Sequence, residues 1–145
     1  SMEKDKFEAF KEKFEKVVAE KIQEHQKFPS ITIDSVIEIE DLNRDFFNFH
    51  RKLTPFGPHN MKPVLELRNQ KVSGYVKQMG KDGNHLKFYI HQPVSGRNIE
   101  CIGFKLGQYM DDFKTNNFDI VYTVEENHWK GNVTYYLIIR DVKFH

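Results

Sequence analysis

Apolar and charged positions alternate at helical spacing in the first part of the chain. From Glu3 to about Gln26 the sequence contains no Gly or Pro, and apolar side chains recur on one side. These side chains are Phe7, Phe10, Phe14, Val17 and Val18. The spacing predicts a long amphipathic helix whose apolar stripe needs a cover. The cover is either the body of the same domain or a preceding domain, and an uncovered stripe would allow the helix to dimerise.

A short strand and a second helix are predicted in residues 28–63. The apolar positions of the strand alternate with polar ones and are Ile31, Ile33, Ile37 and Ile39. Asp41 is a candidate N-cap for a helix that stops at Pro55. The apolar face of this helix holds Leu42, Phe46, Phe49 and Leu53. Two prolines and a glycine in residues 53–60 then indicate a rigid connector.

After Pro63 the apolar period changes to two and stays there almost to the end of the chain. A long first strand is predicted from Val64 to about Met79, with a bend near residues 69–74 where the apolar phase slips by one residue. A turn with two glycines follows at residues 80–84. The remaining predicted elements are a second strand 85–92, a third strand 98–104, a helix 106–113, a fourth strand 118–126, a turn 127–132 and a fifth strand 133–143.

The order of these elements indicates a fold class. Five strands with one helix between the third and the fourth are typical of the OB fold, a small, partly open barrel that binds oligonucleotides or oligosaccharides. Other small barrels, such as SH3-like ones, lack that helix or place it elsewhere. We therefore predict a mainly β chain with a helical N-terminal appendage. The expected divisions are a residue left by tag cleavage with a start methionine at 1–2, the helix at 3–27, the linker at 28–63 and the OB domain at 64–145.

Composition limits the classes of partner. Of the 145 residues, 39% are hydrophobic and 30% are charged, and no run approaches the roughly 18 apolar residues of a membrane span. We expect a cytoplasmic protein that does not contact a membrane. Cys101 is the only cysteine, which excludes an intrachain disulfide and a cysteine zinc site. With a net charge of +1, any binding to nucleic acid must come from a local cluster of Lys and Arg.

The period of two predicts which side chains of the first two barrel strands lie outside. If Leu86, Phe88 and Ile90 fill the barrel, the outward residues of the second strand are His85, Lys87, Tyr89 and His91. If Val72, Gly74 and Val76 are buried, the outward residues of the first strand are Lys71, Ser73, Tyr75 and Lys77. The two strands pair in an OB fold, so the cations and tyrosines among these residues would form one surface for phosphates and stacked bases. The alternative is an ordinary solvated sheet face.

Loop residues add further candidates for binding nucleic acid. Trp129 is the only tryptophan and falls in the turn before the fifth strand, where it either stacks on a base or covers an open end of the barrel. Arg97 and Lys130 are loop cations that either contact phosphate or are merely solvated. The seven histidines include no pair at i, i+4 spacing, and no Ser, His and Asp set can be argued. We therefore expect no metal site, no cofactor and no catalysis in this chain.

Five segments, in order and spacing, resemble the C-terminal region of the RecJ-type single-stranded-DNA exonucleases. They are Leu-Thr-Pro-Phe-Gly-Pro-His-Asn with Lys-Pro-Val at 53–64, Gly-Asn-His-Leu-Lys at 83–87, Ile-Gly-Phe at 102–104, Phe-Asp-Ile-Val at 118–121 and Asn-His-Trp-Lys-Gly at 127–131. The first helix resembles the last helix of that family's DHH-associated domain, and the linker resembles the link to its OB domain. The resemblance covers nearly the whole chain.

The resemblance implies a bacterial enzyme that degrades single-stranded DNA from the 5′ end in recombination and repair, using Mg²⁺ or Mn²⁺. The Asp-His-His motif and the other metal-binding residues of that family's catalytic domain are absent from this sequence. Only the accessory region would therefore be present. A smaller departure is His59, where the family more often has Gly.

Two functions from different classes remain open at this point. The first is a module that binds single-stranded DNA and guides it to a catalytic domain outside the chain. The second is a protein-docking module, in which a strand edge or groove accepts a peptide such as the acidic tail of a single-stranded-DNA-binding protein. Grouping of Lys71, Lys77 and Lys87 with the tyrosines would favour DNA, and scattered cations beside an apolar groove would favour a protein partner.

Overall fold

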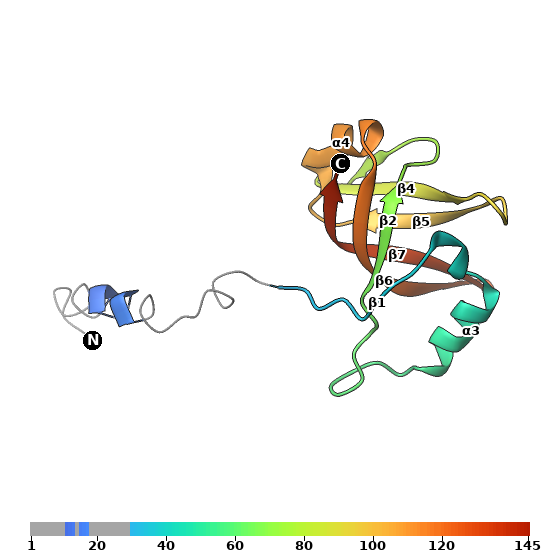
Figure 1. Cartoon of the computed structure of the whole chain (residues 1–145), viewed down its shortest axis with the longest axis horizontal. Coiled ribbons are helices and arrows are strands. Elements are labelled where there is room, and N and C mark those ends of the chain that lie inside the picture. The colour runs from blue at the N-terminus through green and yellow to red at the C-terminus, as the bar shows by residue number, and fades with distance from the viewer. Residues whose placement is uncertain (1–10, 14, 18–29) are drawn as a thin grey trace. The chain divides into compact units, whose positions relative to one another are not determined.

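The computed structural model describes residues 11–13, 15–17 and 30–145 (Figure 1). The chain divides into two units, residues 1–32 and 33–145, and each is described by itself. In the first unit, the described residues 11–13 and 15–17 are helical and exposed. The other residues of the helix predicted at 3–27, with four of its five apolar positions, lie outside the described residues.

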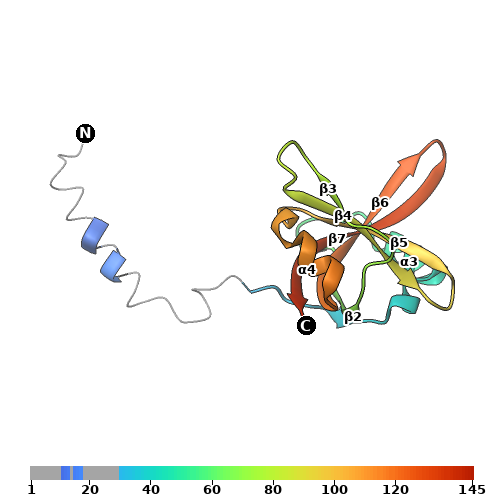
Figure 2. The ribbon, with the colours of Figure 1, turned by 90° about the horizontal axis from the view of Figure 1, so that it is seen from above.

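The second unit is mainly β, as the sequence predicts. One seven-stranded sheet runs in the order β1-β2-β6-β7-β5-β4-β3, and all its pairings are antiparallel except β1 with β2 and β5 with β7 (Figures 1 and 2). The strands are β1 (Ser35–Val36), β2 (Leu65–Gln70), β3 (Lys77–Met79), β4 (His85–Gln92), β5 (Arg97–Gly103), β6 (Phe118–Trp129) and β7 (Asn132–Phe144).

The long first strand of the predicted five-stranded barrel is interrupted. Its ends are β2, which pairs with β6, and β3, which pairs with β4. Val72 lies opposite Ile90 and Lys77 opposite Lys87, so this segment advances five residues while β4 advances three. The surplus residues bulge outward near Gly74, whose φ of +80° suits a residue without a side chain. The predicted bend is therefore present, but it breaks the strand in two.

Inward side chains of the strands form one apolar core. The predicted parity of β4 is confirmed, because Leu86, Phe88 and Ile90 are almost fully buried. Further core side chains come from β2, β5, β6 and β7 and are Leu65, Leu67, Ile99, Cys101, Phe118, Ile120, Tyr122, Val124, Leu137 and Ile139. Outward positions alternate with these and remain available for other contacts.

A helical segment covers one end of the sheet, at the place predicted for the helix between the third and fourth barrel strands. It consists of the 3-10 helix η2 (Gly107–Tyr109) followed by α4 (Met110–Thr115). Phe113 packs against Phe88, with the centres of the two rings 4.7 Å apart. Gly107 is required here, since a Cβ at that position would lie 2.1 Å from the carbonyl oxygen of Gly83 in the β3–β4 turn.

The linker covers the opposite end with the 3-10 helix η1 (Ile39–Asp41) and α3 (Arg44–Lys52) (Figure 1). Asn43, not Asp41, caps α3, because its side-chain oxygen accepts from the backbone N–H groups of Asp45 and Phe46. The Asp41 carboxylate instead accepts from the backbone N–H of Glu38 at 2.9 Å. The predicted N-cap was therefore wrong by two residues.

Two further details of the linker differ from the prediction. The strand expected from the alternating isoleucines is only two residues long, and Val36 within it is exposed. In α3, Phe49 is 62% exposed, whereas Phe47 packs against the core and His50 is buried. The face of α3 that packs on the sheet is therefore formed by Phe46, Phe47 and His50.

The connector before β2 is fixed by the side chain of Asn60, which donates to the carbonyl oxygens of Leu53 and Pro55 at 2.8 and 2.9 Å. The Thr54–Pro55 peptide bond is cis. His59 has a φ of +67°, a region in which glycine is favoured. The departure expected at His59 therefore falls at a left-handed backbone position.

The β6–β7 hairpin is longer than predicted. Trp129 pairs with Asn132 in the strands, so the turn consists of Lys130 and Gly131 alone. Both turn residues have positive φ, as in the two-residue turns that match the twist of paired strands. The loop expected at residues 127–132 is thus mostly strand. No helix of the described residues is long and apolar enough to span a membrane.

Candidate nucleic-acid interface

The outward residues of three neighbouring strands form a row across the sheet. Tyr89 on β4 lies opposite Glu100 on β5, and Glu100 lies beside Tyr136 on the parallel strand β7. All three side chains are partly buried. They border a hollow of about 520 Å³. Its other lining residues are Asn98, Ile102, Asn127, Thr134 and Tyr135.

Two lysines lie beside this hollow at the edge of the sheet. Lys77 and Lys87 are directly opposite one another in the β3–β4 pair. The Lys87 ammonium lies 2.7 Å from the Glu100 carboxylate and 5.9 Å from the centre of the Tyr89 ring. The hydrogen bond to Glu100 raises the pKa of Lys87 and keeps this ammonium charged. Of the five cations and tyrosines predicted to form one surface, the structure therefore brings Lys77, Lys87 and Tyr89 together, with a carboxylate among them.

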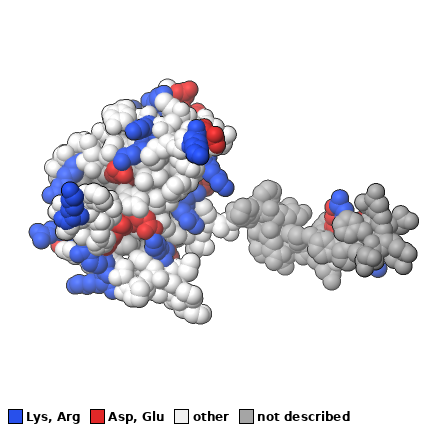
Figure 3. All heavy atoms as spheres, turned by 180° about the vertical axis from the view of Figure 1, so that it is seen from behind, with Lys and Arg blue, Asp and Glu red and all other residues white. Residues whose placement is uncertain are grey.

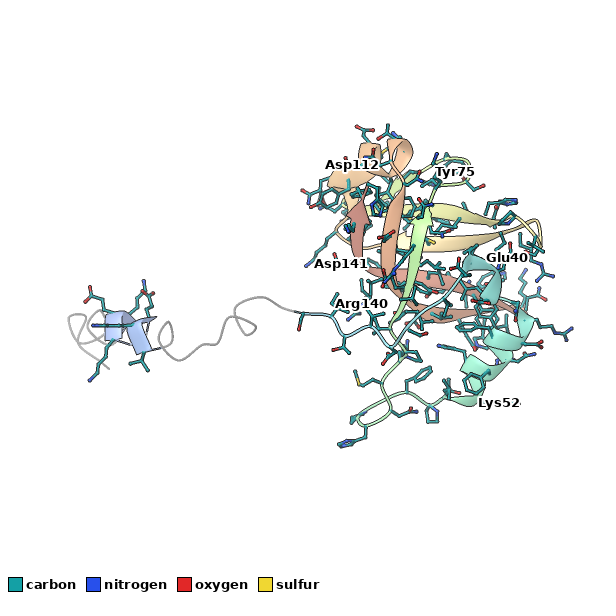
Figure 4. The ribbon with its side chains drawn as sticks, viewed as in Figure 1. Glu40, Lys52, Tyr75, Asp112, Arg140 and Asp141 are labelled. Carbon is teal, nitrogen blue, oxygen red and sulfur yellow. The ribbon has the colours of Figure 1, made fainter. Side chains whose placement is uncertain are left out.

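Lys71 and Tyr75 lie in the interrupted segment between β2 and β3. Both are exposed, and Tyr75 is 67% exposed on the bulge. The backbone N–H of Ser73 donates to the carbonyl oxygen of Tyr89 at 2.7 Å, which holds this segment beside β4. Tyr75 lies toward the α4 end of the sheet, far from Lys52 on α3 (Figure 4).

Trp129 and Lys130 lie at the tip of the β6–β7 hairpin. The β3–β4 and β6–β7 hairpins project on the same side of the sheet and diverge (Figure 2). Trp129 is 68% exposed, so its ring does not cover an end of the sheet. The Lys130 ammonium lies 5.9 Å from the centre of that ring. An exposed aromatic ring beside a cation is suited to stacking on a base next to a phosphate.

His85 and Arg97 are not among the residues that line this hollow. The Nδ1 atom of His85 accepts from the backbone N–H of Lys105 at 3.0 Å, and its ring packs edge-on against Phe104. These contacts hold the His85 ring in place at the α4 end. Arg97 is exposed and lines a smaller hollow of about 260 Å³ beside Phe47 and Tyr135.

The surface on this side carries charges of both signs. Figure 3 shows it with Lys and Arg interspersed with Asp and Glu, rather than as one basic patch. Phosphates would therefore meet individual cations and not a uniform positive field. The net charge of +1 agrees with this pattern.

The α3 end contains aromatic side chains that already have partners. Phe47 stacks on Tyr135 with ring centres 4.1 Å apart, and the Tyr135 hydroxyl accepts from the Arg51 guanidinium at 2.6 Å. Arg51 also donates to Glu126 at 3.3 Å. This network fastens the linker helix to the β6–β7 hairpin.

His50 is buried beneath α3 between Phe46 and Phe56, and 4% of its surface is exposed. Neither ring nitrogen has a hydrogen-bond partner among the described residues. Desolvation lowers the pKa of His50, with smaller opposing effects from nearby carboxylates such as Glu126. Burial raises the pKa of the Cys101 thiol, so this cysteine is not an activated nucleophile.

Within residues 11–13, 15–17 and 30–145, no group of three or more His, Cys, Asp or Glu side chains is placed to hold a metal ion. The region lacks the carboxylate and imidazole donors that a divalent cation needs in one place.

Sequence reasoning missed Glu100 and Tyr136. The period of two within β5 and β7 could have assigned both to the outer face, since Ile99, Cys101 and Leu137 are inward. Their closeness to Tyr89 depends on the β4–β5–β7 pairing register, which one sequence does not reveal.

Comparison with known proteins identifies the family. Residues 33–141 match the family described as the RecJ OB domain. This chain belongs to that family. The resemblance to RecJ-type exonucleases is therefore confirmed over the linker and the sheet.

The relatives that the chain resembles are longer proteins. It is 26% identical over 121 residues to the single-stranded-DNA-specific exonuclease RecJ of Bacillus subtilis (strain 168), covering 83% of this chain and 15% of that protein. The crystal structure of RecJ in complex with Mn²⁺ from Thermus thermophilus matches with a TM-score of 0.63 and 21% identity, covering 99% of this chain and 20% of that one. A Mg²⁺ complex of RecJ from the same organism gives a TM-score of 0.59 at 19% identity, covering 99% of this chain and 21% of that one. The chain thus spans about a fifth or less of the relatives' length.

Proposed function

We propose that this chain is the single-stranded-DNA-binding region of a longer RecJ-like exonuclease that degrades from the 5′ end. In this role it guides the strand toward a catalytic domain outside the chain, where Mg²⁺ or Mn²⁺ would act. The observation that carries the proposal is the outer face of β3, β4, β5 and β7 in a RecJ OB domain. Tyr89 and Tyr136 line one hollow there, and Lys77 and Lys87 lie beside it at the sheet edge. The exonuclease named as a relative is specific for single-stranded DNA.

The division of labour on this face follows from its chemistry. Lys77 and Lys87 at the sheet edge would contact phosphates, and Tyr89 and Tyr136 would stack on bases. Each stacked base contributes about 1 to 3 kcal/mol in proteins of this kind. Trp129 and Lys130 on the second hairpin would hold the next part of the strand, with Lys71, Tyr75, His85 and Arg97 as outer contacts. Because phosphates and base faces occur in every sequence, the face would accept many sequences.

We also propose that β2 and β3 are two halves of one barrel strand, which would make the sheet a five-stranded OB barrel with β1 as an addition. This is supported by the pairing of the two halves with β6 and β4 and by the Val72–Ile90 bridge between them. The domain divisions predicted at 3–27, 28–63 and 64–145 remain part of this proposal. The helix 3–27 would then come from the preceding domain.

A second candidate function is docking of a protein partner, such as the acidic tail of a single-stranded-DNA-binding protein. It is favoured by the near-neutral net charge and by the mixed charges on the side that carries both hairpins (Figure 3). Lys77 and Lys87 would then bind carboxylates instead of phosphates. The two functions make different predictions for the isolated chain: only the first requires it to bind single-stranded DNA when no partner protein is present.

The test is fluorescence anisotropy of a labelled single-stranded oligonucleotide at low and high salt. We expect wild-type binding to weaken with a log–log salt slope of about −0.7 for each phosphate contact. The variant Lys77→Ala with Lys87→Ala should lose about tenfold or more in affinity at low salt, because both cations are removed.

The matched control, Lys114→Ala with Lys143→Ala, removes two lysines elsewhere and has the same net charge as the test variant. It should bind single-stranded DNA within about twofold of wild type. Equal losses in the two double variants would mean that only net charge matters. Absence of DNA binding at low salt, together with binding of an acidic peptide, would support the docking function instead.

A further inference from the structure

Glu100 occupies the middle of the proposed binding face. Its neighbours across the strands are Tyr89 on one side and Tyr136 on the other. The side chain points outward, since Ile99 and Cys101 on either side of it are buried. It is 30% exposed at the hollow that the two tyrosines line. An acidic side chain at this place opposes the phosphates of any bound strand.

Both contacts of the Glu100 carboxylate go to one oxygen. The Lys87 ammonium lies 2.7 Å from Oε2, and the Tyr89 hydroxyl donates to the same Oε2 at 3.2 Å. Among residues 30–145, no hydrogen bond reaches Oε1. Glu100 therefore neutralises Lys87 in the free protein and keeps one acceptor available to a ligand.

These contacts have two consequences for a bound strand. A phosphate at Lys87 must share the ammonium with Glu100, which weakens the attraction of the sheet edge. Within the hollow, a free carboxylate oxygen repels phosphate and accepts from N–H donors. Bases, and not the backbone, are therefore expected to enter the hollow.

The free oxygen also distinguishes the two pyrimidines. Cytosine carries an amino group at N4, which a carboxylate accepts from, whereas thymine has the acceptor O4 at the equivalent position. The two rings are similar in size, so they stack similarly on Tyr89 or Tyr136. Glu100 thus favours one pyrimidine by a hydrogen bond and disfavours the other by repulsion between acceptors.

We propose that Glu100 is a specificity-determining residue, which lowers the affinity of Lys87 for phosphate and makes the hollow prefer cytosine over thymine. The proposal rests on the proposed function, because it concerns how the same face reads single-stranded DNA.

The test compares labelled oligocytidylate and oligothymidylate of about 12 nucleotides, a length that one OB fold can hold. The wild-type chain should bind oligocytidylate about fivefold more tightly. Glu100→Gln should bind oligothymidylate about fivefold more tightly than wild type does, with a steeper salt slope, and lose the cytosine preference. Asp111→Asn, an exposed carboxylate on α4 with the same charge change, should leave both affinities within about twofold.

A second background separates the two effects of Glu100. In a Lys87→Gln protein, the gain of Glu100→Gln on oligothymidylate should shrink, because no ammonium remains to be released. An undiminished gain there would overturn the role assigned to the ion pair.

The outcomes also distinguish this inference from the proposed function. Wild-type binding that Glu100→Gln leaves unchanged, with equal affinity for both pyrimidines, would overturn the inference and leave the DNA-binding function standing. No binding of either oligonucleotide by either protein at low salt would overturn both. Circular dichroism of each variant checks that the fold is retained.

Discussion

Tyr135 and Tyr136 are adjacent in β7 and serve two different regions. At the α3 end, the ring of Tyr135 stacks on Phe47 and its hydroxyl is held by Arg51. Both tyrosines line the hollow, but no other aromatic ring of the described residues packs against Tyr136. A tyrosine thus holds α3 against the sheet at position 135, and a tyrosine at position 136 remains available to a ligand.

The difference follows from the period of two in a strand. Successive side chains point to opposite faces, so Tyr135 shares the inward parity of Leu137 and reaches Phe47 on α3, although it also borders the hollow. Tyr136 lies on the open face alone. The linker covers this end of the sheet with Leu42, which follows η1, and with Phe47 and Arg51 of α3. The open face keeps its polar and aromatic groups for an external partner. Changes at the α3 end should therefore alter stability, and changes on the open face should alter binding.

The largest expected effect lies at the covered end. Leu42 is 2% exposed and packs against the core, so Leu42→Ala should lower the free energy of unfolding by about 3 kcal/mol. Urea unfolding measures this loss. The control is Val94→Ala, which shortens an 85% exposed side chain and should change the free energy by less than about 0.5 kcal/mol.

Without urea, at a temperature where Leu42→Ala remains folded, its affinity for single-stranded DNA should equal that of wild type within about twofold, since the outer face is untouched. A selective loss of DNA affinity in the folded variant would contradict the separation of the two regions.

A smaller effect is expected on the open face. Tyr136→Ala should weaken DNA binding about tenfold, because one stacked base loses its platform. Tyr136→Phe keeps the ring and should bind within about threefold of wild type. Anisotropy titrations measure both. Equal binding by all three proteins would remove Tyr136 from the interface.

The smallest effect concerns the pH dependence of stability at the covered end. The pKa of His50 is lowered in the folded state, so the unfolded chain binds this proton more readily. The stabilisation is fully present above the ordinary histidine pKa of about 6.5 and is lost as the pH falls from there toward the lower folded value. His50→Phe should therefore lose less unfolding free energy than wild type between about pH 7.5 and about pH 5.5.

His59→Gln, which alters an exposed histidine, serves as the control and should follow the wild-type pH profile. Chemical denaturation at the two pH values provides the comparison. An identical slope for His50→Phe and wild type would show that His50 does not link protonation to stability.

Much of the fold could be predicted because its signals are local. The bounds of β4, the burial of Leu86, Phe88 and Ile90, and a helix between β5 and β6 all follow from apolar spacing and turn residues. The cap of α3 was harder, since Asp41 and Asn43 both suit an N-cap. The chain uses Asp41 to hold the turn at Glu38 and leaves Asn43 for the helix.

The rest depended on contacts between distant segments. The alternating isoleucines of the linker predict a longer strand, but only Ser35 and Val36 pair with β2, at the edge of the sheet. The lysines and Tyr89 of the interface were found from parity within single strands. Glu100 was missed because its contact with Lys87 depends on how β4 and β5 are aligned.

The central claim is that single-stranded DNA binds the open face and not the covered end. The most direct measurement is an NMR titration of isotope-labelled protein with oligocytidylate, following backbone amide shifts. We expect the largest changes at Lys77, Lys87, Tyr89, Glu100 and Tyr136, with little change in α3. Changes centred on α3, or on Arg68 and Lys143 around the hollow between β2 and β7, would contradict the account.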